Sequence, residues 1–76
     1  MGYTITRETT NGTETWDYDF AKTGEAPTAK ARELAAAHFR RTTSSRVVVT
    51  VRLNGHEIAA ARFVDNGRTL SLVTTS

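Results

Sequence analysis

Apolar and polar residues alternate with a period of two over much of the chain, a spacing typical of half-buried strands. The first such segment, YTITRETTNGTETWDYDF at residues 3–20, is interrupted at its midpoint by Asn11-Gly12. An Asn-Gly pair between alternating segments predicts a hairpin with a two-residue turn, and this turn would place Arg7 opposite Trp16. We expect the aromatic face of this hairpin to pack inward and its polar face to meet water. The predicted inward face consists of Tyr3, Ile5, Arg7, Trp16, Tyr18 and Phe20.

The segment at residues 27–41, PTAKARELAAAHFRR, predicts a helix. Alanine and other good helix formers dominate it, and Pro27 suits the first helical turn. Small apolar residues recur at helical spacing, which would let the helix pack closely on a sheet. This stripe consists of Ala31, Leu34, Ala35 and either His38 or Phe39.

Three apolar runs separated by two further Asn-Gly pairs predict three more strands in residues 46–73. A two-residue turn at Asn54-Gly55 would pair Val51 with Ile58, and would set Arg52 opposite Glu57 as a favourable cross-strand ion pair.

The turn at Asn66-Gly67 allows two registers. A two-residue turn would pair Phe63 with Leu70, whereas a three-residue loop from Asp65 would pair Ala60 with Leu72. We favour the three-residue loop because it brings the largest apolar set onto one face, and a one-residue slip would undo this. That face would hold Val47, Val49, Val51, Ile58, Ala60, Leu70 and Leu72.

This register turns a second apolar set toward solvent on the opposite face, where a clustered apolar patch is typical of an interface. The predicted protein interface consists of Val48, Ala61, Phe63 and Val73, with Phe63 at its centre. The elements in order predict an α+β fold of the form ββαβββ. It would be one small domain over residues 1–76, an antiparallel sheet of about five strands with one helix packed on one face.

The composition narrows the class of protein. The chain has 76 residues and no cysteine, so disulfides and a cysteine-ligated zinc site cannot stabilise it. The chain has no apolar run of about 18 residues and no signal-peptide core, so we expect a soluble cytoplasmic domain with no membrane partner.

Charge is unevenly distributed along the chain. The net charge is +2, but residues 26–76 hold eight Lys and Arg against three Asp and Glu, whereas residues 1–25 are acidic. Two arginines before the loop TTSS and one after it form a candidate phosphate-contacting cluster, because guanidinium groups and hydroxyls both bind phosphate. The predicted contact residues for a nucleic acid or an acidic partner are Arg40, Arg41, Arg46 and Arg52.

No motif indicates a reaction. Two histidines without carboxylates at defined spacing do not predict a metal site. Glu8, Asp17 and Asp19 share one predicted hairpin face and could hold magnesium, but we interpret them as an acidic surface that discourages edge pairing. No nucleophile motif is present, so we predict no enzyme, no cofactor and no small-molecule substrate.

An alanine-rich helix followed by Asn-Gly hairpins resembles the layout of several small phage and mobile-element proteins, including some anti-CRISPR proteins. The resemblance covers size and element order and matches no motif, so it assigns no residue. We predict a non-catalytic module that binds a nucleic acid or an acidic protein or nucleoprotein surface. The alternative is a protein-interaction or inhibitor domain of the phage type, acting through the outer apolar patch or as a homodimer.

Overall fold

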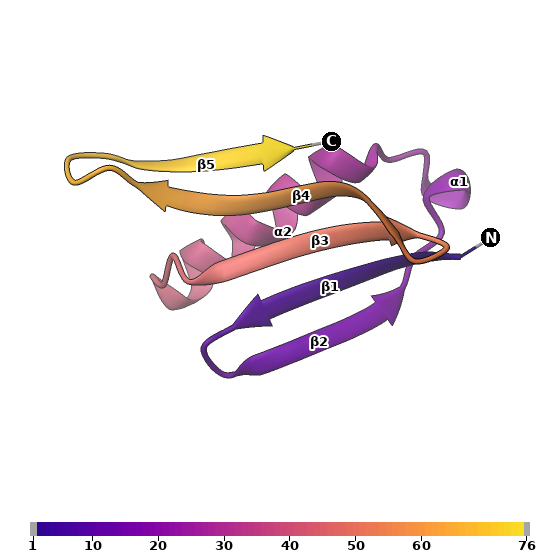
Figure 1. Ribbon diagram of the computed structural model, residues 1–76, viewed down its shortest axis with the longest axis horizontal. Coiled ribbons are helices and arrows are strands. Elements are labelled where there is room, and N and C mark those ends of the chain that lie inside the picture. The colour runs from indigo at the N-terminus through magenta and orange to yellow at the C-terminus, as the bar shows by residue number, and fades with distance from the viewer. Residues whose placement is uncertain (1, 76) are drawn as a thin grey trace.

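A computed structural model describes residues 2–75 and shows an α+β fold, a five-stranded antiparallel sheet with one main helix on one face (Figure 1). The strand order is β2-β1-β3-β4-β5, and α2 contacts β3, β4 and β5. The predicted fold class is therefore confirmed. The elements are β1 (Tyr3–Thr9), β2 (Gly12–Asp17), α1 (Phe20–Thr23), α2 (Pro27–Thr42), β3 (Val47–Leu53), β4 (His56–Asp65) and β5 (Leu70–Thr75).

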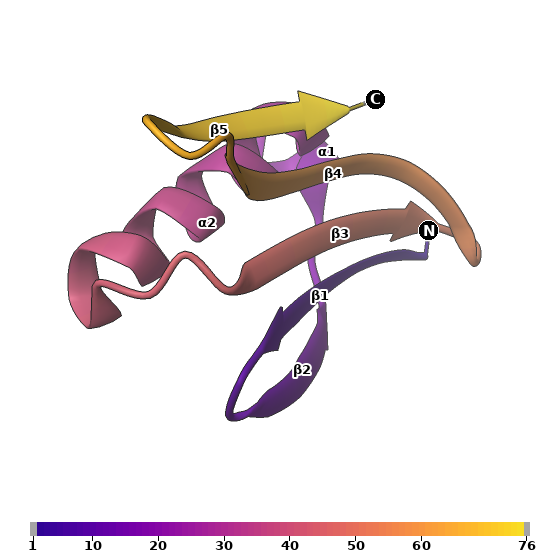
Figure 2. The ribbon, with the colours of Figure 1, turned by 60° about the vertical axis from the view of Figure 1, so that its left-hand side comes forward.

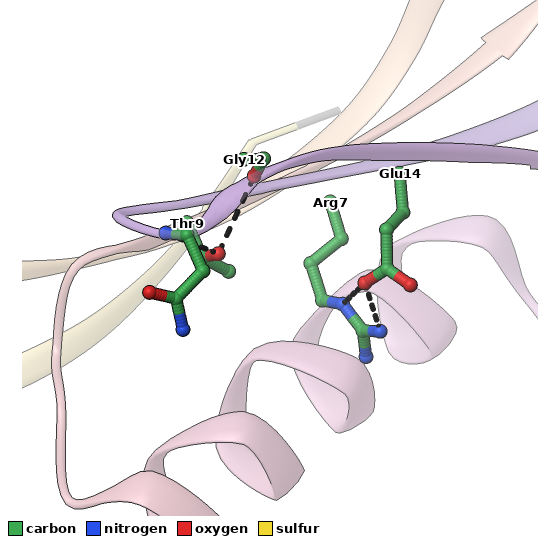
Figure 3. Close-up of polar contacts among 5 residues, drawn as sticks. Arg7, Thr9, Gly12 and Glu14 are labelled. Carbon is green, nitrogen blue, oxygen red and sulfur yellow. Dashed lines mark hydrogen bonds and ion pairs between the residues drawn. The ribbon is translucent and has the colours of Figure 1, made fainter.

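The hairpin of β1 and β2 forms as predicted but with a shifted turn. Thr9 pairs with Gly12, so the turn residues are Thr10 and Asn11 rather than Asn11 and Gly12. The Thr9 hydroxyl donates to the Gly12 carbonyl oxygen and accepts the Asn11 N–H, which closes the turn (Figure 3). The pairing partner of each β1 residue therefore moves by two positions, so that Arg7 lies opposite Glu14 and the prediction that it lies opposite Trp16 is wrong. Because the change is an even number of residues, each paired side chain keeps its predicted face.

The segment after β2 contains a short helix, α1, that the sequence analysis did not predict. The Asp19 carboxylate caps it by accepting the Lys22 N–H, and Gly24 ends it in the left-handed conformation with φ 74°. The helix buries Phe20 against Tyr3 and Tyr18, with ring centroids 5.1 and 4.8 Å apart. Phe20 is thus in the core as predicted, although it is not part of a strand.

The helix α2 matches its prediction to within one residue. Its buried stripe is Ala31, Ala35 and His38, and the two alanines are fully buried against the sheet. The helix ends at Thr43, whose left-handed conformation (φ 58°) directs its N–H to the Phe39 carbonyl oxygen.

A β-bulge between β3 and β4 changes the predicted face of most of β4. The turn at Asn54-Gly55 and the register that sets Arg52 opposite Glu57 are as predicted. The guanidinium of Arg52 donates to the Thr6 hydroxyl, and within residues 2–75 it forms no ion pair with Glu57. Val51 then pairs with Ala59, which leaves Ile58 as an extra residue. Beyond a one-residue bulge, every side chain points to the opposite face from the one an unbroken ladder would give. The core face of β4 therefore holds Ala59, Ala61 and Phe63, and the prediction that Ala60 lies there is wrong.

The hairpin of β4 and β5 adopts neither predicted register. Asp65 pairs with Leu70 and Phe63 with Leu72, so the loop has four residues, Asn66 to Thr69. The Asn66 N–H donates to the Thr69 carbonyl oxygen, and Gly67 takes the positive φ (91°) that the loop requires.

The sheet has a covered face and a free face. On the covered face α2 packs against β3, β4 and β5, and the buried apolar residues are Ile5, Phe20, Ala31, Ala35, Val47, Val49, Val51, Ala59 and Ala61. On the opposite face, which we call the outer face, no helix of residues 2–75 lies (Figures 1 and 2). One row across all five strands of the outer face reads Thr15, Thr6, Thr50, Ala60 and Thr75.

Candidate functional site: an arginine-rich end

One end of the molecule gathers four segments that are distant in sequence. The C-terminal end of α2, the start of β3, the β1–β2 turn and the β4–β5 turn all lie there in both views (Figures 1 and 2). The turns and helix caps of the fold bring these segments together. Three of the four segments carry arginine: the end of α2, the start of β3 and the β4–β5 turn. We call this region the arginine end, and its arginines are Arg40, Arg41, Arg46, Arg62 and Arg68.

Each arginine is held there by its element. Arg40 and Arg41 occupy the last turn of α2, where a cation also complements the helix dipole. Arg46 directly precedes β3, and Arg62 lies on the outer face opposite Val48 of that strand. Arg68 lies in the β4–β5 loop.

A hollow of about 430 Å³ lies between the end of β1, the start of β3 and β4. Arg46 and Arg62 both line it, so the structure brings together two arginines that are 16 positions apart in the sequence. Hydroxyl groups, one carboxylate and one aromatic ring complete the wall. The remaining lining residues are Glu8, Thr9, Thr10, Ser45, Val47, Val48 and Phe63.

The guanidinium groups at this end are not engaged by other residues that the structure describes. Within residues 2–75, none of the five forms an ion pair or a side-chain hydrogen bond with another described residue. Elsewhere Arg7 pairs with Glu14, Lys30 pairs with Glu25 and Glu33, and the guanidinium groups of Arg32 and Arg52 donate hydrogen bonds. Unpaired guanidinium groups retain all their donors for phosphate or carboxylate oxygens.

Acidic groups at this end are fewer and partly engaged. Glu8 lines the hollow, and Asp65 accepts the Gly67 N–H at 2.9 Å. Glu14 is bound by Arg7, whose Nε lies 3.1 Å from its Oε1 (Figure 3). That hydrogen bond and the charge of Arg7 lower the pKa of Glu14, so this carboxylate stays ionised and paired. The arginine end therefore keeps an excess of positive charge.

His38 lies at the buried edge of the same region. Burial lowers its pKa, and the positive charges of Arg41 and Arg7 lower it further. Its Nδ1 is buried with no hydrogen-bond partner among the described residues. We therefore interpret His38 as a neutral residue of the interior that does not contact a ligand.

The loop TTSS was expected to offer its hydroxyls to a ligand, but most of them stabilise the loop itself. The Thr42 hydroxyl donates to the His38 carbonyl oxygen and accepts the Ser44 N–H. The Thr43 hydroxyl donates to the Thr42 carbonyl oxygen, and the Ser44 hydroxyl accepts the Arg46 N–H. Ser45 alone of the four residues lines the hollow.

Arg52 is not part of this cluster. It lies near the opposite end of β3, where its guanidinium donates to the Thr6 hydroxyl at 3.3 Å and it is paired across the strands with Glu57. The prediction grouped it with Arg40, Arg41 and Arg46, but it lies six positions beyond Arg46 along an extended strand. The grouping is corrected accordingly.

The predicted apolar interface is also divided by the structure. Val48 and Val73 lie on the outer face and are exposed, but Ala61 is fully buried and Phe63 packs against Phe39 of α2 with ring centroids 5.1 Å apart. The bulge at Ile58 is the reason, because it turns Ala61 and Phe63 toward the helix. The outer face also exposes Val64, and Arg62 lies between Val48 and Val73 across the strands.

The three carboxylates considered for magnesium do not converge. Glu8 lies opposite Thr13 and Asp17 opposite Thr4, which places them in different rows of the sheet, while Asp19 caps α1. Within residues 2–75, no group of three or more His, Asp and Glu residues is placed to hold a metal ion. Neither helix in that range is long and apolar enough to cross a bilayer.

Sequence reasoning missed Arg62 and Arg68 as site residues. One signal was present for Arg62. It lies two residues after Ala60 and therefore on the same side of the strand, so the predicted core face would have buried an unpaired guanidinium at a high cost in free energy. No comparable signal existed for Arg68, because its position depends on the length of the β4–β5 loop. Comparison of the chain with protein-family models, curated proteins and solved structures found no match, so the site is assigned from its own geometry.

Proposed function

We propose that the protein is a non-catalytic binding module of the cytoplasm that contacts the phosphate groups of a nucleic acid with its arginine end. The observation that carries this proposal is the gathering of five unpaired arginines at one end, two of them in a hollow that also presents hydroxyls. Arginine binds phosphate oxygens in bidentate fashion, and hydroxyls supply additional donors.

The shape of the site favours backbone contact over base recognition. The arginines project from a helix end, a strand start, a strand face and a turn, so no single helix or strand presents them as a reading element. Contacts of this kind fix a protein on the phosphate backbone and carry no sequence information by themselves. We therefore expect binding with little sequence preference and a strong dependence on salt.

A competing proposal is a protein-interaction or inhibitor domain that uses the exposed valines of the outer face, Val48, Val64 and Val73. The two proposals differ in their response to salt. Phosphate contact weakens steeply as salt increases, whereas apolar contact hardly responds.

The test is titration of the protein into fluorescently labelled duplex DNA, duplex RNA and single-stranded oligonucleotides at several salt concentrations. The double variant Arg46→Ala/Arg62→Ala removes both arginines of the hollow. We expect the removal of each arginine to lower affinity about tenfold or more, because hydrogen bonds between charged groups are worth about 1.5–3 kcal/mol. On duplex DNA the slope of log affinity against log salt should become shallower by about 0.9 for each phosphate that the variant no longer binds.

A matched control removes two positive charges from the other end of the molecule. Lys22 lies in α1 and Arg52 near the far end of β3, so Lys22→Ala/Arg52→Ala changes the net charge equally without touching the arginine end. Equal weakening by both double variants would show that net charge alone drives binding and that the arginine end is not a site. Absence of binding to all three nucleic acids would refute the proposal, and binding to an acidic protein with the same arginine dependence would replace it.

A further inference from the structure

The two edges of the sheet differ in how they are protected against pairing with another strand. A free strand edge presents unpaired backbone groups, and proteins commonly protect such edges with charged residues. The edge strand β2, GTETWD, carries Glu14 and Asp17. The other edge strand, β5, reads LSLVTT and has no charged residue, no proline and no bulge.

The backbone groups at the free edge of β5 can be identified from the β4–β5 turn. Asn66 and Thr69 form a hydrogen-bonded pair, and such pairs alternate along an antiparallel ladder. Leu70, Leu72 and Thr74 therefore direct their N–H and C=O groups away from β4. The contact of Arg32 agrees with this, because its guanidinium donates to the Leu72 carbonyl oxygen at 3.4 Å.

Exposed apolar side chains concentrate beside the same edge. Of the four large apolar residues exposed within residues 2–75, Leu70 (40%) and Val73 (38%) belong to β5, and Val64 (38%) belongs to the adjacent strand β4. Leu72 is only partly buried against the core. Within residues 2–75, no strand pairs with this edge, and Leu70 and Val73 beside it are exposed.

We propose that β5 pairs antiparallel with β5 of a second copy, so that the dimer has one continuous ten-stranded sheet. A two-fold axis at Leu72 would set Leu72 opposite its own copy, Leu70 opposite Thr74, and Ser71 opposite Val73. All of these residues are uncharged, so the strand is complementary to itself, as a two-fold interface requires. The acidic edge β2 would bring like charges together in the same arrangement, so the pairing is specific to β5.

Pairing also replaces the hydrogen bond that Arg32 makes to this edge. The Leu72 carbonyl oxygen now accepts from Arg32 at the long end of the hydrogen-bond range. In the dimer it accepts the backbone N–H of the facing Leu72, and the exposed leucines and valines near the axis cover one another. An unrelated extended strand could occupy the same edge, and the experiment separates the two occupants.

The experiment measures mass in solution by light scattering during size-exclusion chromatography over a range of protein concentrations. Wild type should have twice the mass of the 8.3 kDa chain at high concentration and should dissociate on dilution. Val73→Lys and Val73→Glu each place like charges close to the axis, so each variant alone should be monomeric. An equimolar mixture of the two should recover a twofold mass, because the opposite charges then meet.

The control is Val48→Lys, which introduces the same charge at a residue of the same type, face and exposed fraction, on a strand away from this edge. It should remain dimeric. Hydrogen exchange of wild type gives a readout without substitution: the amides of Leu70, Leu72 and Thr74 should be protected at high concentration and exchange freely on dilution. A monomeric wild type at every concentration, or a dimer that both Val73 variants leave intact, would overturn the proposal.

Discussion

The position of Phe63 shows how strongly one side chain depends on the pairing of its strand. Its ring lies at 39° to the ring of Phe39, with the centroids 5.1 Å apart, and it closes the core between β4 and the C-terminal half of α2. The same ring also forms part of the wall of the hollow beside Arg46 and Arg62. Phe63 therefore links the packing of the core to the placement of the two arginines.

Phe63→Ala should destabilise the fold. Truncating a buried phenylalanine costs about 3–5 kcal/mol, and because this ring is only partly buried we expect about 2 kcal/mol. Urea unfolding followed by circular dichroism measures this change. Val64→Ala, at the exposed neighbouring position, serves as the control and should cost much less. If Phe63→Ala left the stability unchanged and altered the oligomeric state, the placement of Phe63 in the core would be wrong and its ring would lie on the outer face.

His38 should make stability depend on pH near neutrality. Its folded-state pKa lies below the ordinary value of 6.5, chiefly because of burial, so below about pH 6.5 the unfolded chain binds more protons than the folded one. Stability should therefore fall as the pH decreases from about 7.5 to 5.5. His38→Met, which keeps an uncharged side chain there, should flatten this part of the profile in thermal unfolding.

The comparison for His38 is His56→Gln, at an exposed position next to the β3–β4 turn, which should retain the slope. Below about pH 4.5 every variant should lose stability. There the unfolded chain protonates Glu14 and Glu25 before the folded chain does, because hydrogen bonds from Arg7 and Tyr18 respectively lower the pKa of these carboxylates in the folded state. If His38→Met keeps the wild-type slope near neutrality, the buried imidazole is not its source.

At the scale of elements, the bulge at Ile58 determines which face of β4 is buried. Before the bulge, Arg52 and Glu57 pair on the outer face, and after it Ala59 and Ala61 lie in the core. Ile58 itself packs against the core from the bulge. One extra residue thus allows the polar pair next to the turn to lie on the outer face while the apolar residues farther along the strand lie in the core.

A one-residue deletion and a one-residue insertion should separate these roles. Removing Ile58 leaves Val51 opposite Ala59 in an unbroken ladder, so the fold should persist with a loss of about 1–2 kcal/mol from the missing side chain. Inserting one alanine after Ala60 instead turns Ala61 and Phe63 outward, because the bulge already holds one extra residue. That variant should not fold, because a small domain has only a few kcal/mol of net stability. Circular dichroism and thermal unfolding distinguish the two, and similar behaviour of both variants would contradict the assigned bulge.

Local signals in the sequence were sufficient to predict the main helix and the strands, but they did not predict the registers in which the strands pair. The helix from Pro27 and the Asn54-Gly55 turn follow from propensity and turn chemistry, which act within a few residues. The bulge and the four-residue β4–β5 loop depend on packing against α2, which no short segment encodes. The arginine cluster was predicted in part because Arg40, Arg41 and Arg46 are close in sequence, whereas Arg62 reaches them only through the corrected face of β4.

At the scale of the whole molecule, the two proposed surfaces are compatible. The arginine end lies at one extremity of the sheet, and the pairing edge of β5 runs along its side (Figure 1). Because paired β5 strands would run in opposite directions, the two arginine ends of a dimer would point away from each other. Such a dimer could contact two separated stretches of one nucleic acid, and a linked second contact raises overall affinity without new chemistry.

The pairing of β1 with β3 has a consequence for how the chain folds. The three hairpins and α2 join neighbours in sequence, but β1 pairs with β3 across about forty intervening residues, and this ladder alone connects the β1–β2 hairpin to the other three strands. Closing so long a loop is slow compared with forming any of the hairpins. Until β1 arrives, β3 remains an edge whose sequence, VVVTV at residues 47–51, combines high β-propensity with no charge. The interval before β1 and β3 meet is therefore the stage of folding at which this protein is most exposed to aggregation.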